Sequence, residues 1–128
     1  MKTPHWKRLR HAPAVGTELC KLDDLDATGH RKITVGQSPN TFSILLIRQG
    51  QLVTAFVDLC PHQWLPLTFK GDNVVTRDGV EIVCSNHQAR FDAADGRPLS
   101  GPVTPDCGLC VVPVAVDAEG AVRITAEG

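Results

Sequence analysis

Short apolar segments alternate with glycine- and proline-containing turns along most of the chain. The apolar segments are strand-sized, rich in β-branched residues and without a helical period, which is typical of β-strands. Eleven Gly and nine Pro separate them. The pattern predicts short strands at residues 17–22, 32–35, 42–48, 52–58, 74–76, 80–84, 89–92, 110–116 and 121–125. An antiparallel all-β sandwich or small barrel is therefore expected.

Turn signals join several of these strands. They are Arg48-Gln49-Gly50-Gln51, Arg77-Asp78-Gly79, Asp95-Gly96 and Ala118-Glu119-Gly120. Residues 23–26 can form one helical turn that ends at Gly29, too short to be stable alone. A chain of 128 residues is the usual size of one domain, so residues 1–128 are expected to fold as a single unit.

Charge and hydropathy exclude several classes of function. The net charge of -1 argues against a general nucleic-acid-binding protein. Residues 1–11 carry Lys2, Lys7, Arg8 and Arg10 without an acid, which predicts a solvated basic tail. No apolar run approaches the roughly 18 residues of a membrane span, and the first residues lack a secretory signal. We expect a soluble, cytoplasmic protein that is monomeric when free and binds neither nucleic acid nor membrane.

Two short segments each combine one cysteine with one histidine. Cys60-Pro61-His62 is followed, after 21 residues, by Cys84-Ser85-Asn86-His87. Two Cys on one iron and two His on the other are the ligand set of one kind of [2Fe-2S] cluster. Both segments follow predicted strands, and loops at one end of a sandwich can converge. Cys60, His62, Cys84 and His87 are therefore the predicted metal ligands.

Zinc is the alternative metal for this set, since Cys2His2 is a common structural zinc site. The spacing argues against it. Zinc modules usually group their ligands as Cys-Cys and His-His pairs, whereas each pair here is mixed. A structural zinc module that presents a binding surface nevertheless remains an alternative from the residues alone.

From about Leu19 to Ile124 the chain resembles the Rieske ferredoxin family. The resemblance rests on Cys-x-His, a spacer, and Cys-x-x-His, followed by Ala89-Arg90-Phe91-Asp92 and Gly101-Pro102. It implies a Rieske-type β fold with a small cluster-binding subdomain at one end, at about residues 59–105, and one [2Fe-2S] cluster per chain. By this resemblance Cys60 and Cys84 bind the inner iron, His62 and His87 bind the outer iron, and residues 101–105 cover the cluster.

Several positions differ from family patterns. Trp64 and Gln88 stand where the family commonly has glycine. High-potential members carry a disulfide and hydroxyl donors at places that here hold Leu65, Asn86, Ala89 and Phe91, and the chain has no Tyr. Hydrogen bonds to the cluster sulfurs raise the potential, so a low-potential centre is expected.

The predicted function is one-electron transfer from a reductase to a terminal oxygenase or a similar oxidoreductase, without substrate chemistry of its own. An oxygenase α subunit needs a further domain with a second iron site, for which this length leaves no room. The alternative function is a permanent small subunit of a larger oxidoreductase, similar to the small subunits of some nitrite reductases.

Cys107-Gly108-Leu109-Cys110 has the spacing of a redox dithiol, but no second such pair completes a zinc site, and the other histidines lack ligand spacing to any cysteine. Cys20 is expected to be a structural strand residue, and Cys107 and Cys110 are expected to be strand-end cysteines, with a labile disulfide or a metal role as alternatives. The remaining histidines are expected to be exposed: His5, His11 and His30.

Overall fold

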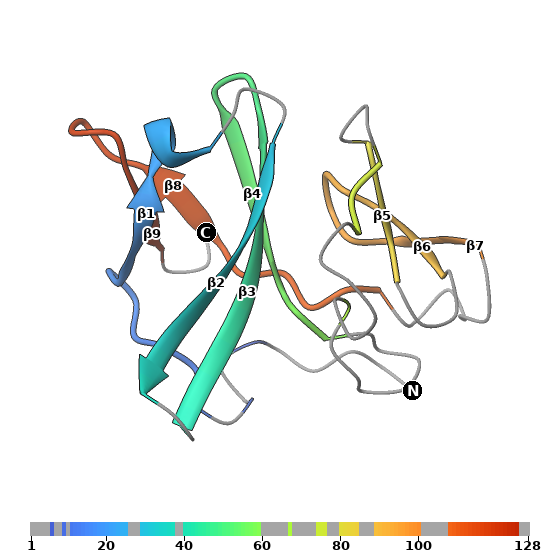
Figure 1. Cartoon of the computed structure of the whole chain (residues 1–128), viewed down its shortest axis with the longest axis horizontal. Coiled ribbons are helices and arrows are strands. Elements are labelled where there is room, and N and C mark those ends of the chain that lie inside the picture. Colours follow the sequence, from blue (N-terminus) through green and yellow to red (C-terminus); the bar gives the residue numbers. More distant parts are fainter. Residues whose placement is uncertain are drawn as a thin grey trace.

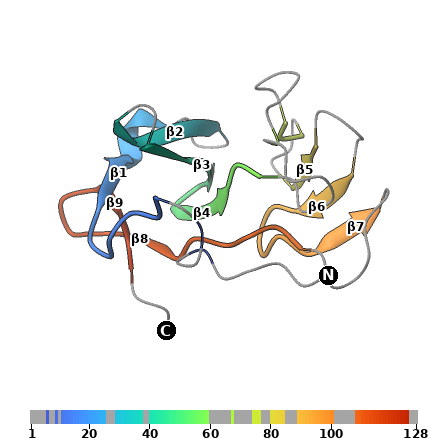
Figure 2. The same cartoon turned by 90° about the horizontal axis from the view of Figure 1, so that it is seen from below.

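The computed structural model describes residues 6, 9, 11–25, 29–37, 40–59, 67, 74–76, 80–84, 89–100 and 108–125. These residues form a 3₁₀ turn, Leu22–Asp24, and nine strands: β1 (Glu18–Lys21), β2 (His30–Gln37), β3 (Asn40–Gln49), β4 (Leu52–Val57), β5 (Glu81–Val83), β6 (Arg90–Asp92), β7 (Pro98–Ser100), β8 (Val114–Val116) and β9 (Ala121–Ile124). The strands make three antiparallel sheets, ordered β1-β9-β8, β2-β3-β4 and β5-β6-β7. The β2-β3-β4 sheet lies between the other two (Figures 1 and 2).

Strands β3 and β4 of the central sheet are buried on both faces. Along β3, Phe42, Ile44 and Leu46 pack into one hydrophobic core, whereas Leu45 and Ile47 pack into another. Successive residues of a strand point to opposite faces, so the unbroken apolar run at residues 44–47 requires a core on each side. This explains why the run shows no alternation with polar residues.

The first core lies between the central sheet and the β1-β9-β8 sheet. Its buried residues are Trp6, Leu19, Cys20, Leu25, Phe42, Ile44, Leu46, Val53, Ala55, Val57, Cys110, Val112, Val122 and Ile124. The second core lies between the central sheet and the β5-β6-β7 sheet. Its buried residues are Leu45, Ile47, Phe56, Leu67, Val74, Val75, Ile82, Cys84, Ala89, Phe91, Ala93 and Leu109.

Residues 110–112 run beside β4 and connect the sheets. The Val57 amide donates to the Cys110 carbonyl over 2.8 Å, and the Val112 amide donates to the Ala55 carbonyl over 2.9 Å. Val111 and Phe56 form an isolated antiparallel bridge. The central sheet is thereby extended toward β8, which closes the fold around the first core.

The all-β prediction is confirmed. Seven of the nine predicted strands coincide with an observed strand, although β2 and β3 extend beyond the predicted ranges 32–35 and 42–48. Residues 74–76 contribute only a bridge between Val75 and Ile82, and within 110–116 only Val114–Val116 is regular. The helical turn is found at Leu22–Asp24, closed by the Lys21 amide donating to the Asp24 carboxylate over 2.9 Å. Its predicted last residues 26–28, and the turn at 77–79, lie outside the described residues.

The pattern missed strand β7, because Pro98 and the neighbouring turn at Gly96 read as loop signals. A proline is tolerated at the start of a strand on a sheet edge, and Pro98 begins β7, the edge partner of β6. Its pairing is irregular, with a register shift between Arg90 and Phe91.

The prediction of a solvated tail at residues 1–11 is wrong for Trp6. The Trp6 side chain is 1% exposed and belongs to the first core, and Leu9 packs against the same core. An indole ring provides more apolar area than any other side chain, so its burial outweighs the preference of neighbouring basic residues for water. The four basic residues of this segment lie outside the described residues.

Within the described part of the chain, no helix has the length and hydropathy that crossing a membrane requires.

Gly96 lies where the turn between β6 and β7 packs against β4. Its φ is 79°, its amide donates to the Asp92 carbonyl, and its carbonyl accepts the Leu109 amide, both over 2.7 Å. A Cβ added there would lie 2.9 Å from Cε1 of Phe56 and 3.0 Å from Cβ of Leu109. Gly120 also has a positive φ, 81°, but a Cβ added there would meet no atom within 4 Å.

We expect Gly96→Ala to destabilise the fold much more than Gly120→Ala. Both variants force a left-handed conformation, which costs about 1–2 kcal/mol. Only Gly96→Ala adds overpacking, which costs about 1–3 kcal/mol more. Urea unfolding followed by circular dichroism measures both free energies of unfolding, and equal losses would show that the turn does not pack against Phe56.

Asp117 organises the hairpin between β8 and β9. Its carboxylate accepts the amides of Glu119 and Ala121 and the Nε–H of Arg123, each over 2.9 Å. The hydrogen bond from the Ala121 backbone amide, followed by the one from the Arg123 side chain, lowers the pKa of Asp117 from 3.8 to about 2. Arg123 also donates to Glu18 on β1 over 3.2 Å, which ties the hairpin to the neighbouring strand.

Because the folded-state pKa of Asp117 lies below its unfolded value, its contribution to stability is present above pH 4 and is lost as the pH falls toward 2. We expect Asp117→Asn to lower stability at neutral pH and to flatten the fall in stability over this acidic range. Thermal unfolding between pH 2 and 7 measures both. Asp95→Asn, which removes a turn carboxylate that accepts the Arg97 amide over 3.0 Å, is the control. An unchanged pH profile in Asp117→Asn would contradict the assignment.

Candidate metal centre

Of the four predicted ligands, the structure describes Cys84. Cys60, His62 and His87 lie outside the described residues, as do Trp64, Leu65, Asn86, Gln88, Cys107 and residues 101–105. Within the described ranges, no three His, Cys, Asp or Glu side chains are grouped as metal ligands. The described part of the site consists of Cys84 and the residues that flank the two motifs.

The second motif begins where the hairpin of β5 and β6 ends. Val83 pairs with Arg90, and the next residue on each strand, Cys84 and Ala89, is joined by the Cys84 amide donating to the Ala89 carbonyl over 2.9 Å. The Val83 amide also donates to the Val74 carbonyl over 2.7 Å. Residues 85–88, which include His87, form the connection between these paired ends. The prediction that Cys84 closes a strand is confirmed.

The Cys84 side chain is buried in the second core. It is 1% exposed, its thiol is free, and its neighbour across the hairpin, Ala89, is fully buried. Phe91 is also fully buried in this core. A free thiol in dry, apolar surroundings fits a sulfur ligand to an iron that is shielded from water. Ala89 and Phe91 bring no hydroxyl donor to these surroundings.

The first motif follows the end of β4. After Val57 the Asp58 amide donates to the Ser43 carbonyl over 2.9 Å, and the Leu59 amide donates to the Val57 carbonyl over 2.7 Å. Beyond the motif, Leu67 is fully buried in the second core, the core that also contains Cys84. The segments before and after the first motif are therefore anchored in the body of the protein, and Leu67 shares a core with the second motif.

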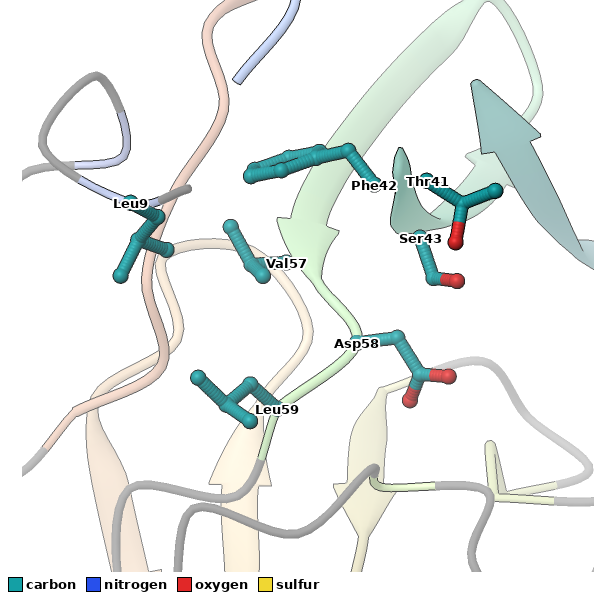
Figure 3. A pocket seen from close by; sticks show the side chains of 7 residues that line it. All are labelled: Leu9, Thr41, Phe42, Ser43, Val57, Asp58 and Leu59. Atoms are coloured by element: carbon teal, nitrogen blue, oxygen red, sulfur yellow. The ribbon is translucent and has the colours of Figure 1, made fainter. Parts of the chain in front are cut away.

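Figure 3 shows the end of β4 from close by. The side chains of Val57 and Leu59 point to the side of Phe42, whereas the carboxyl group of Asp58 points to the opposite side, with the hydroxyl of Ser43. A cavity of about 280 Å³ is lined by Leu9, Thr41, Phe42, Ser43, Val57, Asp58 and Leu59. Val57 and Leu59 thus lie on the side of the first core, and Asp58 lies on the opposite side of the strand end.

Asp58 was not selected from the sequence. It is 5% exposed, and its carboxylate lies 3.5 Å from Nζ of Lys32. The only signal for it in the sequence is an acid at the end of an apolar strand, two residues before Cys60.

The other described cysteines are core residues, as predicted. Burial raises the pKa of Cys110 to about 11, and burial, followed by the charge of Asp24, raises the pKa of Cys20. Reactive thiols have lowered pKa values, so neither cysteine has the properties of a redox centre.

The histidine predictions are partly confirmed. His11 is exposed, with a φ of 63°. His30 is half-buried because it begins β2 opposite Ile47, so the prediction that it is exposed is wrong. His5 lies outside the described residues.

Comparison with known proteins identifies the family. The profile of the Rieske [2Fe-2S] domain matches residues 16–115. No match was found among curated proteins.

Solved structures share the fold over nearly the whole chain. A chain in the complex of reduced oxygenase and oxidized ferredoxin of carbazole 1,9a-dioxygenase is 27% identical, with a TM-score of 0.67, over 90% of this chain and 96% of that chain. The ferredoxin of carbazole 1,9a-dioxygenase from Nocardioides aromaticivorans IC177 is 20% identical, with a TM-score of 0.65, over 89% and 100%. Sphingomonas yanoikuyae B1 ferredoxin is 21% identical, with a TM-score of 0.66, over 88% and 99%.

Because the family profile covers most of the sequence and the described strands adopt the fold of these ferredoxins, the chain belongs to the Rieske [2Fe-2S] domain family.

Proposed function

We propose that the protein is a one-electron carrier that takes electrons from a reductase and passes them to a terminal oxygenase or a similar oxidoreductase. The match to a chain of an oxygenase–ferredoxin complex carries this proposal, because the two chains cover 90% and 96% of each other at 27% identity. Family membership implies a Rieske-type [2Fe-2S] cluster, which supplies one-electron chemistry when bound. The protein then needs partner proteins rather than a substrate of its own.

The proposed ligands are Cys60 and Cys84 for one iron and His62 and His87 for the other. The buried, free thiol of Cys84 supports its place on the iron that is shielded from solvent. The hydrogen bond between the backbones of Cys84 and Ala89 supports the assignment of His87, because it joins the two residues that flank the segment containing His87. The subdomain is proposed to comprise residues 59–105 of the single domain, and it contains the β5-β6-β7 sheet.

We also propose that this carrier is soluble, cytoplasmic and monomeric when free. Transient redox complexes use small interfaces, so the carrier needs only a limited surface around its histidine ligands for each partner.

The ligand assignment predicts a coloured protein with about two iron atoms per chain and an electron paramagnetic resonance signal, after reduction, typical of mixed Cys and His ligation. We expect Cys84→Ser to lose most of the iron and the signal, because it removes a thiolate ligand. Cys110→Ala is the matched control, since it removes a buried thiol that is assigned no iron. Full iron content in Cys84→Ser, or a colourless protein with bound zinc, would contradict the assignment.

Ala89 and Phe91, which stand where high-potential members carry hydroxyl donors, predict a low midpoint potential. Rieske centres range from about -150 to +300 mV, and a midpoint above roughly +100 mV would contradict the prediction. We expect Ala89→Ser to raise the midpoint, because a new hydroxyl beside Cys84 stabilises the added electron. Ala93→Ser introduces the same group at another buried alanine of the second core and should leave the midpoint unchanged. Protein-film voltammetry of the three proteins measures these values, and equal shifts in both variants would refute the local effect.

A further inference from the structure

Asp58 is the one buried charged residue in the described part of the chain. Its side chain is fully shielded from solvent, and its Oδ2 lies 3.5 Å from Nζ of Lys32, whose side chain is 37% exposed. Burying a carboxylate is costly unless a partner compensates its charge. Because a buried ion pair contributes little to the stability of a fold, a buried carboxylate at this position suggests another role.

The ion pair reaches across the central sheet. Lys32 on β2 pairs with Leu45 on β3, which in turn pairs with Phe56 on β4. Residues directly opposite each other point to the same face, and so does the residue two positions further along a strand. Asp58 therefore lies on the face of Leu45 and Phe56, which is the face of the second core. Figure 3 agrees, since its carboxyl group points away from Val57.

Asp58 is also the residue at which the chain leaves the sheet. Its amide donates to the Ser43 carbonyl over 2.9 Å, and the hydrogen bond from the Leu59 amide to the Val57 carbonyl makes a three-residue turn centred on it. Cys60 follows two residues later. Two successive Cα–Cα steps span at most about 7.6 Å, so whatever fixes the backbone at Asp58 also limits where Cys60 can lie.

We propose that the Lys32–Asp58 ion pair positions the segment Cys60-Pro61-His62, and thereby sets the geometry of two cluster ligands. The proposal rests on the ligand assignment made above. Groups that orient metal ligands act on the metal centre without touching it. Asp58 and Lys32 are thus positioning residues: the carboxylate fixes the exit of the chain from β4, and the ammonium group makes its burial tolerable.

The test uses the full, iron-loaded chain and the variants Asp58→Asn, Lys32→Met and both together. Electron paramagnetic resonance of the reduced proteins reports ligand geometry, and the rate of iron release to a chelator reports how firmly the ligands are held. We expect the same change in g values in all three variants, because each breaks the same pair, and several-fold faster iron release. The double variant should show no more than the larger single effect.

Two controls accompany these variants. Lys32→Arg keeps the charge and should keep the parent spectrum. Lys21→Met breaks an exposed pair of similar length, 3.7 Å from Nζ of Lys21 to Oε1 of Glu18, on the β1-β9-β8 sheet, and should also keep it. That sheet lies at the other end of the molecule from β5-β6-β7 (Figure 1).

The inference is overturned if folded Lys32→Met has the same g values and the same rate of iron release as the parent protein. If Asp58→Asn does not fold, Lys32→Met alone decides the test. A spectral change in Asp58→Asn without one in folded Lys32→Met also overturns it, because the pair would not be the positioning unit. If the parent protein has iron and the Rieske signal, either of these results overturns the role of the ion pair but leaves the proposed function intact. A parent protein without the signal overturns both.

Discussion

Burial of β3 and β4 on both faces holds the two ends of this molecule together. Ile44 and Leu46 face the first core, and Leu45 and Ile47 face the second, so the same few residues contribute to both cores. Apolar area removed from water is the main source of stability in a domain of this size, and here one central sheet supplies it in two directions. The β5-β6-β7 sheet can therefore remain small, since Phe56 and its neighbours complete its core.

This arrangement anchors the two motifs that are proposed to bind the cluster. The second core that contains Cys84 is also packed against the central sheet from which the first motif leaves. A loop that carries ligands has few contacts of its own and depends on its ends for position. Backbone hydrogen bonds hold the ends of both loops. The Cys84 amide donates to the Ala89 carbonyl, and the two residues before Cys60 donate to the carbonyls of Ser43 and Val57. The fold provides anchored strand ends, and the motifs add the chemistry.

Much of this could be predicted from the sequence, because local signals and tertiary structure agree. Continuous apolar runs marked the central strands, and Gly50 and Gly120, at φ values of 62° and 81°, marked turns that the structure forms. The failures occur where tertiary contacts outweigh local preference. Trp6 stands among basic residues and is nevertheless buried, and Pro98 begins a strand because a sheet edge tolerates it.

By itself the sequence determined the fold class, and it predicted the ligand pairs, because strand periodicity and Cys/His spacing are local properties of the chain. It also predicted a low potential, since the residue types at positions 89 and 91, Ala and Phe, carry no hydroxyl group. Only the tertiary structure decided that residues 44–47 serve two cores and that Asp58 is buried against Lys32. Burial and ion pairing depend on which strands become neighbours, and in β-sheets neighbours are set by pairing between distant residues.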